Sequence, residues 1–146
     1  GILLPHCGQS QSAFLMINHV NTLLLNGSKD DFCFFYHEVM PLQAKPLCAM
    51  MNSSEIWGFE GNLIATTLLD ADRILKVQHA KKRILYLSDL EWANGIDHTW
   101  AGEILINPKL KVIARSHNHA NEIQKYCGVS PTVVQNFNIG QINGYQ

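Results

Sequence analysis

Carboxylate, imidazole and hydroxyl side chains follow several short apolar runs of this chain, at positions where a ligand could reach them. Asp89, Glu91 and Trp92 stand together in the segment DLEW, directly after the apolar run 83–87. Two carboxylates beside an indole could form an acid/base pair on a loop that touches a ligand. Asp89 could equally cap the next turn of the backbone, and Trp92 could pack in the core or at its rim.

The candidate residues fall into a catalytic group and a ligand-binding group. For catalysis the candidates are Asp89, as a general base, and His6. The candidates for ligand binding stand after the other apolar runs or in the DLEW segment: Gly8, Ser10, Ser12, Glu38, Glu91, Trp92, Arg115, Ser116 and His117.

Several of these assignments have a purely structural alternative. Ser10, Ser12 and Ser116 precede predicted helices, so they could cap a helix instead of contacting a ligand. The first loop, HCGQS, lacks both the GxGxxG pattern and the lysine of a P-loop, so it is a weak phosphate-binding signal. Glu38 could bind a ribose hydroxyl, as acidic residues that end a second Rossmann strand do, or it could be solvated.

Histidines near the predicted strand ends could also meet the carboxylates of DLEW at a metal ion. The histidines concerned are His6, His37, His117 and His119. No two of them have a recognised metal-ligand spacing. We therefore predict no metal site and no cofactor.

Apolar runs and helical patterns alternate along the chain and must position these groups. Strands are predicted at 2–4, 32–36, 63–66, 83–87, 111–114 and 132–134. Helices are predicted at 12–25 and 68–79. Between these elements we expect a helical turn at 49–52, a surface loop at 93–102, and a short helix or turn at 103–107.

The stretch 110–138 shows this alternation most clearly. Its apolar strand is followed by Ser116 at a helix start, by Gly128 at a helix end, and by a further strand after Pro131. Such a crossover builds a parallel sheet. We therefore predict an α/β fold: a three-layer sandwich with a mostly parallel, Rossmann-like sheet in a single domain, 1–139, and a polar C-terminal tail, 140–146. The strand ends would bring the candidate residues to one rim of that sheet.

The composition excludes several classes of protein. With 47% hydrophobic and 16% charged residues among 146, the chain is globular and not disordered. Its net charge of −1 argues against nucleic-acid binding, and no segment predicts a membrane span or a cleavable signal. Cys7, Cys33, Cys48 and Cys127 lack a CxxC spacing, so we expect reduced thiols in a cytoplasmic protein.

Three segments resemble the N-terminal Rossmann-like domain of two-domain GT-B glycosyltransferases. VIARSHNHANEIQKYCGVSPTVVQNFN is similar to the last strand–helix–strand unit of that domain, although residues 136–138 read Asn-Phe-Asn where the family has an Asn-Gly-Val-Asp-like turn. RILYLSDLEW resembles the preceding strand, which in that family often ends in a His-Asp pair; here Ser88 replaces the histidine and Asp89 remains. LLPHCGQSQSAF resembles the opening strand and loop, without the usual glycine pair. The overall pattern is also similar to small glycosyltransferase-like proteins of tailed phages that infect cyanobacteria.

The resemblance implies a nucleotide or sugar ligand, with Asp89 as the base and His6, Glu38 and Arg115 around the acceptor. In GT-B enzymes the C-terminal Rossmann domain chiefly holds the nucleotide-sugar, and the donor-binding residues of the family have no counterparts in this sequence. The resemblance therefore implies a domain without independent catalysis. For a phage-encoded protein it further implies a place in the host cytoplasm or in the virion.

Three functions stay open from the sequence. The one we favour is a glycosyltransferase-like domain that binds a nucleotide or sugar ligand, or a protein partner, at the strand C-terminal rim. The second is a component of an active glycosyltransferase that works as a homodimer or with a donor domain on another chain. The third is a phage-encoded structural or host-directed interaction protein, with the loop around Trp92 and Trp100 as its contact surface.

Overall fold

Seven stretches of the chain pair as parallel strands in the computed structural model, which describes residues 1–144 except for the side chain of Asn94. The strands are β1 (Ile2–His6), β2 (Cys33–Glu38), β3 (Ala49–Asn52), β4 (Gly61–Ala65), β5 (Ala80–Leu87), β6 (Leu110–Ala114) and β7 (Thr132–Val133). Their order in the sheet is β3-β2-β1-β4-β5-β6-β7. This order confirms the predicted α/β fold with a parallel, Rossmann-like sheet.

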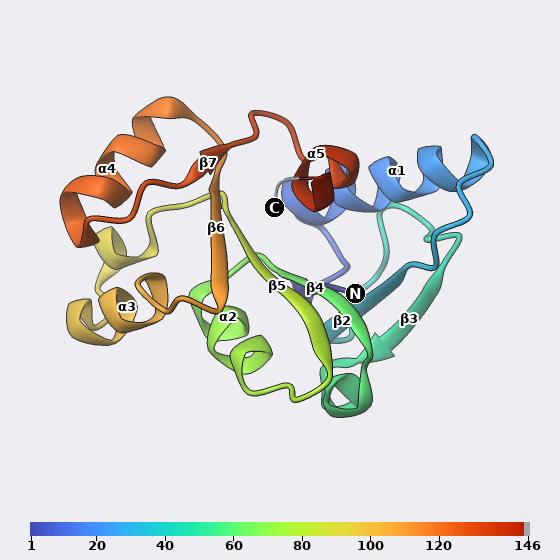
Figure 1. Ribbon diagram of the computed structural model, residues 1–146. Helices are drawn as coiled ribbons and strands as arrows, with labels where there is room; N and C mark the ends of the chain where they lie inside the picture. Colours follow the sequence, from blue (N-terminus) through green and yellow to red (C-terminus); the bar gives the residue numbers. More distant parts are fainter. Residues whose placement is uncertain (145–146) are drawn as a thin grey trace.

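Helices connect the strands and cover both faces of the sheet (Figure 1). They are α1 (Gln11–Leu25), α2 (Leu68–Leu75), α3 (His98–Leu105), α4 (His117–Cys127) and α5 (Ile139–Gly144), with the short 3-10 helices η1 (Ser53–Gly58) and η2 (Glu91–Asn94). Side chains from α2, α3, α4 and η1 form the core on one face, and side chains from α1 and α5 form the core on the other. Within residues 1–144, no helix has the length and apolar character needed to cross a membrane.

Strand β1 lies in the middle of this sandwich and is buried from both sides. Alternate side chains of a strand point to opposite faces, so Leu3 joins the core under α2 while Ile2 and Leu4 join the core under α1. All three side chains are at most 2% exposed. Strand β1 pairs with β2 on one side and with β4 on the other. After β1 the chain adds β2 and β3 on one side of this strand, and it then returns to add β4 on the other side. The loops after β1 and β4 therefore diverge.

The two helices that follow β1 and β4 begin at the same edge of the sheet. The Ser10 hydroxyl accepts a hydrogen bond from the Ala13 N–H (3.1 Å) and caps α1, and the Thr67 hydroxyl accepts one from the Asp70 N–H (3.2 Å) and caps α2. Helix α2 ends at Leu75, earlier than the expected end at 79. Two capped helix starts thus lie beside the carboxyl ends of β1 and β4.

Residues 49–52 form strand β3, so the prediction of a helical turn there was wrong. The segment pairs with β2 in a parallel register that places Met50 opposite Phe34. Alanine and methionine favour helices in isolation, but their propensities are weak and pairing with a neighbouring strand outweighs them.

Residues 98–105 form helix α3, which the sequence analysis placed largely in a surface loop. The Asp97 carboxylate accepts a hydrogen bond from the Trp100 N–H (2.9 Å) and caps this helix. Ala101, Ile104 and Leu105 are buried against the core below. Their burial outweighs the cost of a glycine in a helix, about 1 kcal/mol, which is why Gly102 does not break α3.

Residues 139–144 form helix α5, where the sequence analysis expected a polar tail from 140 onwards. Ile139 and Ile142 are buried and lie one helical turn apart. The His19 ring of α1 accepts a hydrogen bond at Nε2 from the Ile139 N–H (3.1 Å), and Phe137 packs edge-on against the same ring. Two apolar residues and one histidine thus hold this segment to the rest of the fold.

The His19 contact predicts a pH-dependent stability. Burial lowers the pKa of His19 from its ordinary value of 6.5, and the ring accepts the Ile139 N–H only when Nε2 is unprotonated. Below the ordinary pKa the unfolded chain binds more protons than the folded one, so the free energy of unfolding falls as the pH drops through this window. Urea denaturation at about pH 7.5 and about pH 5.5 should show a larger loss for the wild type than for His19→Gln, which keeps an acceptor but does not titrate. An identical loss in both proteins would contradict this role.

Candidate functional site

A pocket of about 200 Å³ opens where the loops after β1 and β4 diverge. We call it the switch-point crevice. Hydroxyl, carboxylate and imidazole groups from three strand ends and the start of α1 dominate its lining, which consists of Leu4, Pro5, His6, Ser10, Ser12, Ala13, Thr66, Thr67, Ser88, Asp89 and Glu91. In open parallel sheets this is the place where ligands bind. The fold thus brings five of the predicted residues to one pocket: His6, Ser10, Ser12, Asp89 and Glu91.

A second pocket, of about 180 Å³, adjoins the crevice on the side of β6. We call it the side pocket. Ser12 and Ser88 line both pockets, so the two meet at these residues, and we call them together the depression. The rest of its lining comes from α1, the end of β5 and the segments after β6 and β7: Gln11, Leu15, Met16, Tyr86, Arg115, Gln135, Asn136 and Phe137. Arg115 is thus the one predicted residue that lies only in the side pocket.

The start of α1 contributes a positive potential to both pockets. The first turn of this 15-residue helix contains no acidic residue, and Ser10 satisfies the Ala13 N–H. Aligned peptide dipoles give a helix N-terminus a partial positive charge that favours anions. With the Arg115 guanidinium nearby, the side pocket is therefore the more cationic part of the depression.

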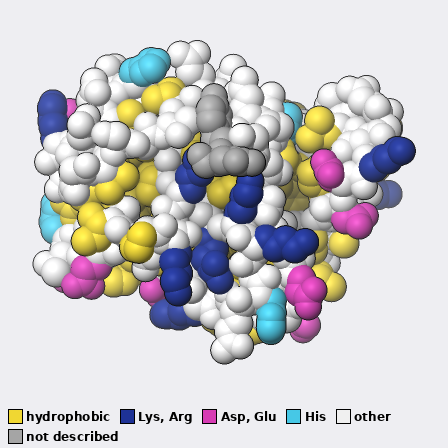
Figure 2. Space-filling view, viewed as in Figure 1, with side chains coloured by type: hydrophobic (Ala, Val, Ile, Leu, Met, Phe, Trp, Pro, Cys, Tyr) yellow, Lys and Arg dark blue, Asp and Glu magenta, His cyan; other side chains and the backbone are white. Residues whose placement is uncertain are grey.

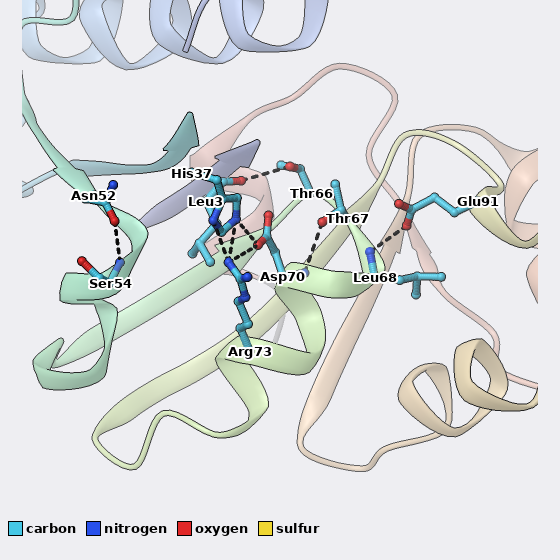
Figure 3. A network of polar contacts seen from close by, with 10 residues as sticks. All are labelled: Leu3, His37, Asn52, Ser54, Thr66, Thr67, Leu68, Asp70, Arg73 and Glu91. Carbon is cyan, nitrogen blue, oxygen red and sulfur yellow. Dashed lines mark hydrogen bonds and ion pairs between the residues drawn. The ribbon is translucent and has the colours of Figure 1, made fainter. Parts of the chain in front are cut away.

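Glu91 occupies the corresponding place at the start of α2. Its Oε2 accepts a hydrogen bond from the Leu68 N–H at 2.6 Å (Figure 3). Burial raises the pKa of Glu91; this hydrogen bond counteracts part of the rise, and the neighbouring Asp89 and Asp70 add to it. The carboxylate therefore fills the anion position of α2, so only the α1 terminus is left for an external anion.

His6 and Gly8 are held by contacts within the first loop. The His6 Nδ1 accepts a hydrogen bond from the Gly8 N–H (3.2 Å), which leaves Nε2 as the ring position that can act on a ligand. Gly8 is buried, and a Cβ atom there would lie 2.6 Å from the Cβ of Met40. Gly8 is therefore needed for the close approach of the loop after β2.

The other predicted residues lie apart from both pockets. Glu38 lines a separate, mostly apolar pocket of about 220 Å³ beside Met40. Trp92, a ligand-binding candidate with packing in the core or at its rim as the alternative, is 7% exposed and stacks on Tyr126 at a centroid distance of 4.7 Å. Ser116 caps α4 through its hydrogen bond with the His119 N–H (3.1 Å), and His117 is exposed in the first turn of that helix.

Several lining residues were not among the predicted site residues. Thr66, Thr67 and Ser88 follow β4 and β5 directly, so strand-end position was the signal that could have included them. Gln135 and Asn136 join the side pocket only because β7 ends after two residues and the chain turns back toward α1. No local pattern in the sequence reports that turn.

A partly buried polar network, which no pattern in the sequence predicted, joins β2 to α2 (Figure 3). His37 Nε2 lies 2.6 Å from Asp70 Oδ1, and the Arg73 Nη1 lies 2.6 Å from His37 Nδ1. Because arginine only donates, Nδ1 must be the acceptor and Nε2 must carry the hydrogen that is donated to Asp70. Asp70 is 1% exposed, and its Oδ2 has no partner among the described residues. This carboxylate ties the middle of the sheet to the helix that starts at the crevice.

Comparisons with protein-family models, with curated proteins and with solved structures found no match to this chain. Within the described residues, no group of three or more histidine, cysteine or carboxylate side chains could hold a metal ion. We therefore infer the ligands that the depression could bind from the side chains that line it. It offers hydroxyls and carboxylates that bind the hydroxyl groups of a ligand, and a cationic side that binds an anion.

The network around Asp70 predicts an asymmetry between two aspartates of α2. Asp70→Asn should lower the free energy of unfolding by about 1–3 kcal/mol, because a charge-assisted bond to His37 is lost inside the protein. Asp72→Asn is the matched control: it removes an ion pair with Lys76 on the same helix, but that pair is partly solvated, and we expect about 0.5 kcal/mol or less. Equal losses for the two variants in urea denaturation would contradict the structural importance of the network.

Proposed function

We propose that this protein binds a small ligand with one anionic and one hydroxyl-rich part, of the nucleotide or sugar-phosphate class, across the switch-point crevice and the side pocket. One observation carries the proposal: two pockets joined at Ser12 and Ser88 lie where the strand order reverses, and their linings are polar in different ways. Each pocket alone is smaller than the roughly 300 Å³ at which drug-sized ligand sites begin, so the ligand spans both.

The anionic part of the ligand belongs in the side pocket. Arg115 supplies a full positive charge there, and the start of α1 supplies backbone N–H groups with no acidic side chain in the first turn. Gln11, Gln135 and Asn136 add amide groups that can donate to phosphate oxygens. A phosphate in the crevice proper would instead face Asp89 and Glu91.

The hydroxyl-rich part belongs in the switch-point crevice. Asp89 is exposed in its lining and can accept hydrogen bonds from sugar hydroxyls, and the hydroxyls of Ser10, Thr66 and Thr67 lie around the same space. Glu91 is a polar part of the same lining. Its pKa is raised, and its Oε2 accepts the hydrogen bond from the Leu68 N–H at the start of α2. The separation of charges between the two pockets thus sets the orientation of the ligand.

Sugar transfer by Asp89 and His6 stays a prediction that rests on the resemblance to GT-B glycosyltransferases. Both residues line the crevice, as a base and a neighbouring group would have to. A transfer reaction also needs a donor and an acceptor held together, and the depression as a whole has room for one small ligand. Binding without independent catalysis is therefore the function we propose.

An interaction with another protein is the second candidate, and one surface favours it. Edge strand β3 and the loop before it expose large apolar side chains: Val39 is 85% exposed, Leu47 54% and Met51 46%. The loop around Trp92 and Trp100 does not provide that surface, because Trp92 is buried and Trp100 packs against the core. Sedimentation analysis should show self-association that Leu47→Glu/Met51→Glu abolishes; a wild-type monomer at all concentrations would exclude a homodimer on this face.

Thermal unfolding in the presence of nucleotides, nucleotide-sugars and sugar phosphates tests the proposed binding. A ligand that binds only the folded state raises the Tm by mass action. We expect at least one member of this panel to raise the Tm, and we expect Ser12→Trp to abolish the shift because its side chain fills the junction of the two pockets. Asp89→Asn should keep binding of the anionic part, so it separates binding from a role as catalytic base.

A matched control places the same bulk elsewhere on α1. Thr22 is exposed in the C-terminal part of this helix and makes only a local hydrogen bond to the Asn18 carbonyl. Thr22→Trp should therefore leave the ligand-induced shift intact. No shift with any compound for the wild type, or a shift that survives in Ser12→Trp, would overturn the proposal.

A further inference from the structure

A larger groove, of about 670 Å³, lies at the opposite edge of the sheet from the switch-point crevice. It runs along the N-terminal ends of β5 and β6 and past the segment that leads into β7. Strand β7 pairs with only Ile113 and Ala114 of β6, so within the described chain the first part of β6 has no strand on that side. The groove exists because β7 is so short. We call it the basic groove.

The basic groove concentrates the positive charge of the protein. Its lining contains Lys81, Lys82, Arg83, Lys109 and Lys111, five of the 11 lysines and arginines in the sequence, and no acidic residue from the described part of the chain. Figure 2 shows Lys and Arg side chains gathered in the middle of the face that it views, with the acidic side chains further out. The net charge is only −1, but the basic side chains are distributed unevenly over the surface.

The lysines of the basic groove are held close to one another by the pairing of β5 and β6. Lys111 pairs with Ile84, which lies two residues after Lys82 on the same strand. The Lys82 ammonium donates to the Asn143 carbonyl of α5 (3.0 Å), which fixes it on that face of the sheet. Burial lowers the pKa of Lys111, and the neighbouring charge of Lys82 lowers it further. Two lysine side chains thus lie near each other in the groove.

Protein carboxylates do not neutralise most of this cluster. Lys81, Lys82, Arg83 and Lys109 form no ion pair with a carboxylate among the described residues. Arg83 donates instead to the backbone carbonyls of Ile74 and Val77. Lys81 and Lys109 are exposed residues of the groove's lining. Their charges are thus open to an anion that arrives from solvent.

We propose that the basic groove is a second binding site, which takes a small molecule carrying two or more phosphate groups. Lysine ammonium groups bind phosphate as point charges, and several of them suit a ligand with several phosphates. The volume lies within the range of small-molecule sites, and aliphatic side chains such as Ile84 and Val129 offer contact for the uncharged part of the ligand. None of the lining residues described is aromatic, which argues against a single-stranded nucleic acid, since such strands stack on aromatic rings.

The basic groove is independent of the proposed function. The two sites lie at opposite ends of parallel strands and share no lining residue. A nucleotide could therefore bind in either place, and variants of each site are needed to tell them apart. Ser12→Trp blocks the depression at the carboxyl edge and leaves the basic groove unchanged.

Calorimetric titration at low salt with inorganic tripolyphosphate and with adenosine triphosphate tests this site. We expect the wild type and Ser12→Trp to bind tripolyphosphate, and we expect Lys81→Glu/Lys109→Glu to weaken its affinity at least about tenfold because attraction at these two positions becomes repulsion. Lys81→Arg/Lys109→Arg keeps the charge and should keep the affinity. Added salt should weaken binding through screening.

Lys29→Glu/Lys45→Glu is the matched control for net charge. Both residues are exposed and neither lines the basic groove, so this variant changes the total charge equally and should bind tripolyphosphate like the wild type. The proposal is overturned if wild type shows no heat of binding, if both double variants lose affinity equally, or if Lys81→Glu/Lys109→Glu binds normally. Tighter binding of a single-stranded oligonucleotide than of adenosine triphosphate would overturn the assignment to small ligands.

Discussion

Burial of β1 on both faces is the constraint on which the rest of the structure depends. Its three aliphatic side chains can leave water only if helices cover the sheet from both sides, which α1 supplies on one face and α2 on the other. Because the covering helices start on either side of β1, the chain must reverse its direction across the sheet at this strand. The crevice at its carboxyl end, with the polar strand ends around it, follows from that reversal.

Short-range patterns were enough to predict the strands that are buried from both sides. Each of β1, β2, β4, β5 and β6 contains a short, mostly apolar run, and between turn residues such a run favours a buried strand. Edge strand β3 is largely exposed, so its residues resemble those of a helix and only the pairing with β2 identifies it. Helices α3 and α5 depend on a few buried residues, such as Ile104 and Ile142, whose partners are far away in the sequence.

The candidate site could be predicted in outline because parallel strands bring their ends to one edge. That rule predicts His6, Ser12 and Asp89 at one rim of the sheet, and all three line the crevice. Trp92 and Glu38 could not be placed, because their surroundings depend on Tyr126 and Met40, which lie on other elements. The network of His37, Asp70 and Arg73 was also out of reach, since it joins residues more than 30 positions apart.

The two edges of the sheet have opposite electrostatic character. Carboxylates such as Asp89 and Glu91 stand at the carboxyl edge, where α1 and Arg115 supply the local positive potential. The amino edge between β5 and β6 is uniformly basic. The two sites that we propose would therefore select different ligands: one with hydroxyl groups and a single anionic part at the carboxyl edge, and a multiply charged anion at the amino edge.

Amide chemical-shift mapping with a nucleotide-sugar such as uridine diphosphate glucose tests the central claim most directly, because it reports the place of binding residue by residue. The account predicts that the largest changes occur at 10–13, 66–67 and 88–89, around the switch-point crevice, and at Arg115. Changes confined to the basic groove, or no changes at all at saturating ligand, would contradict the claim that the reversal at β1 creates the ligand site.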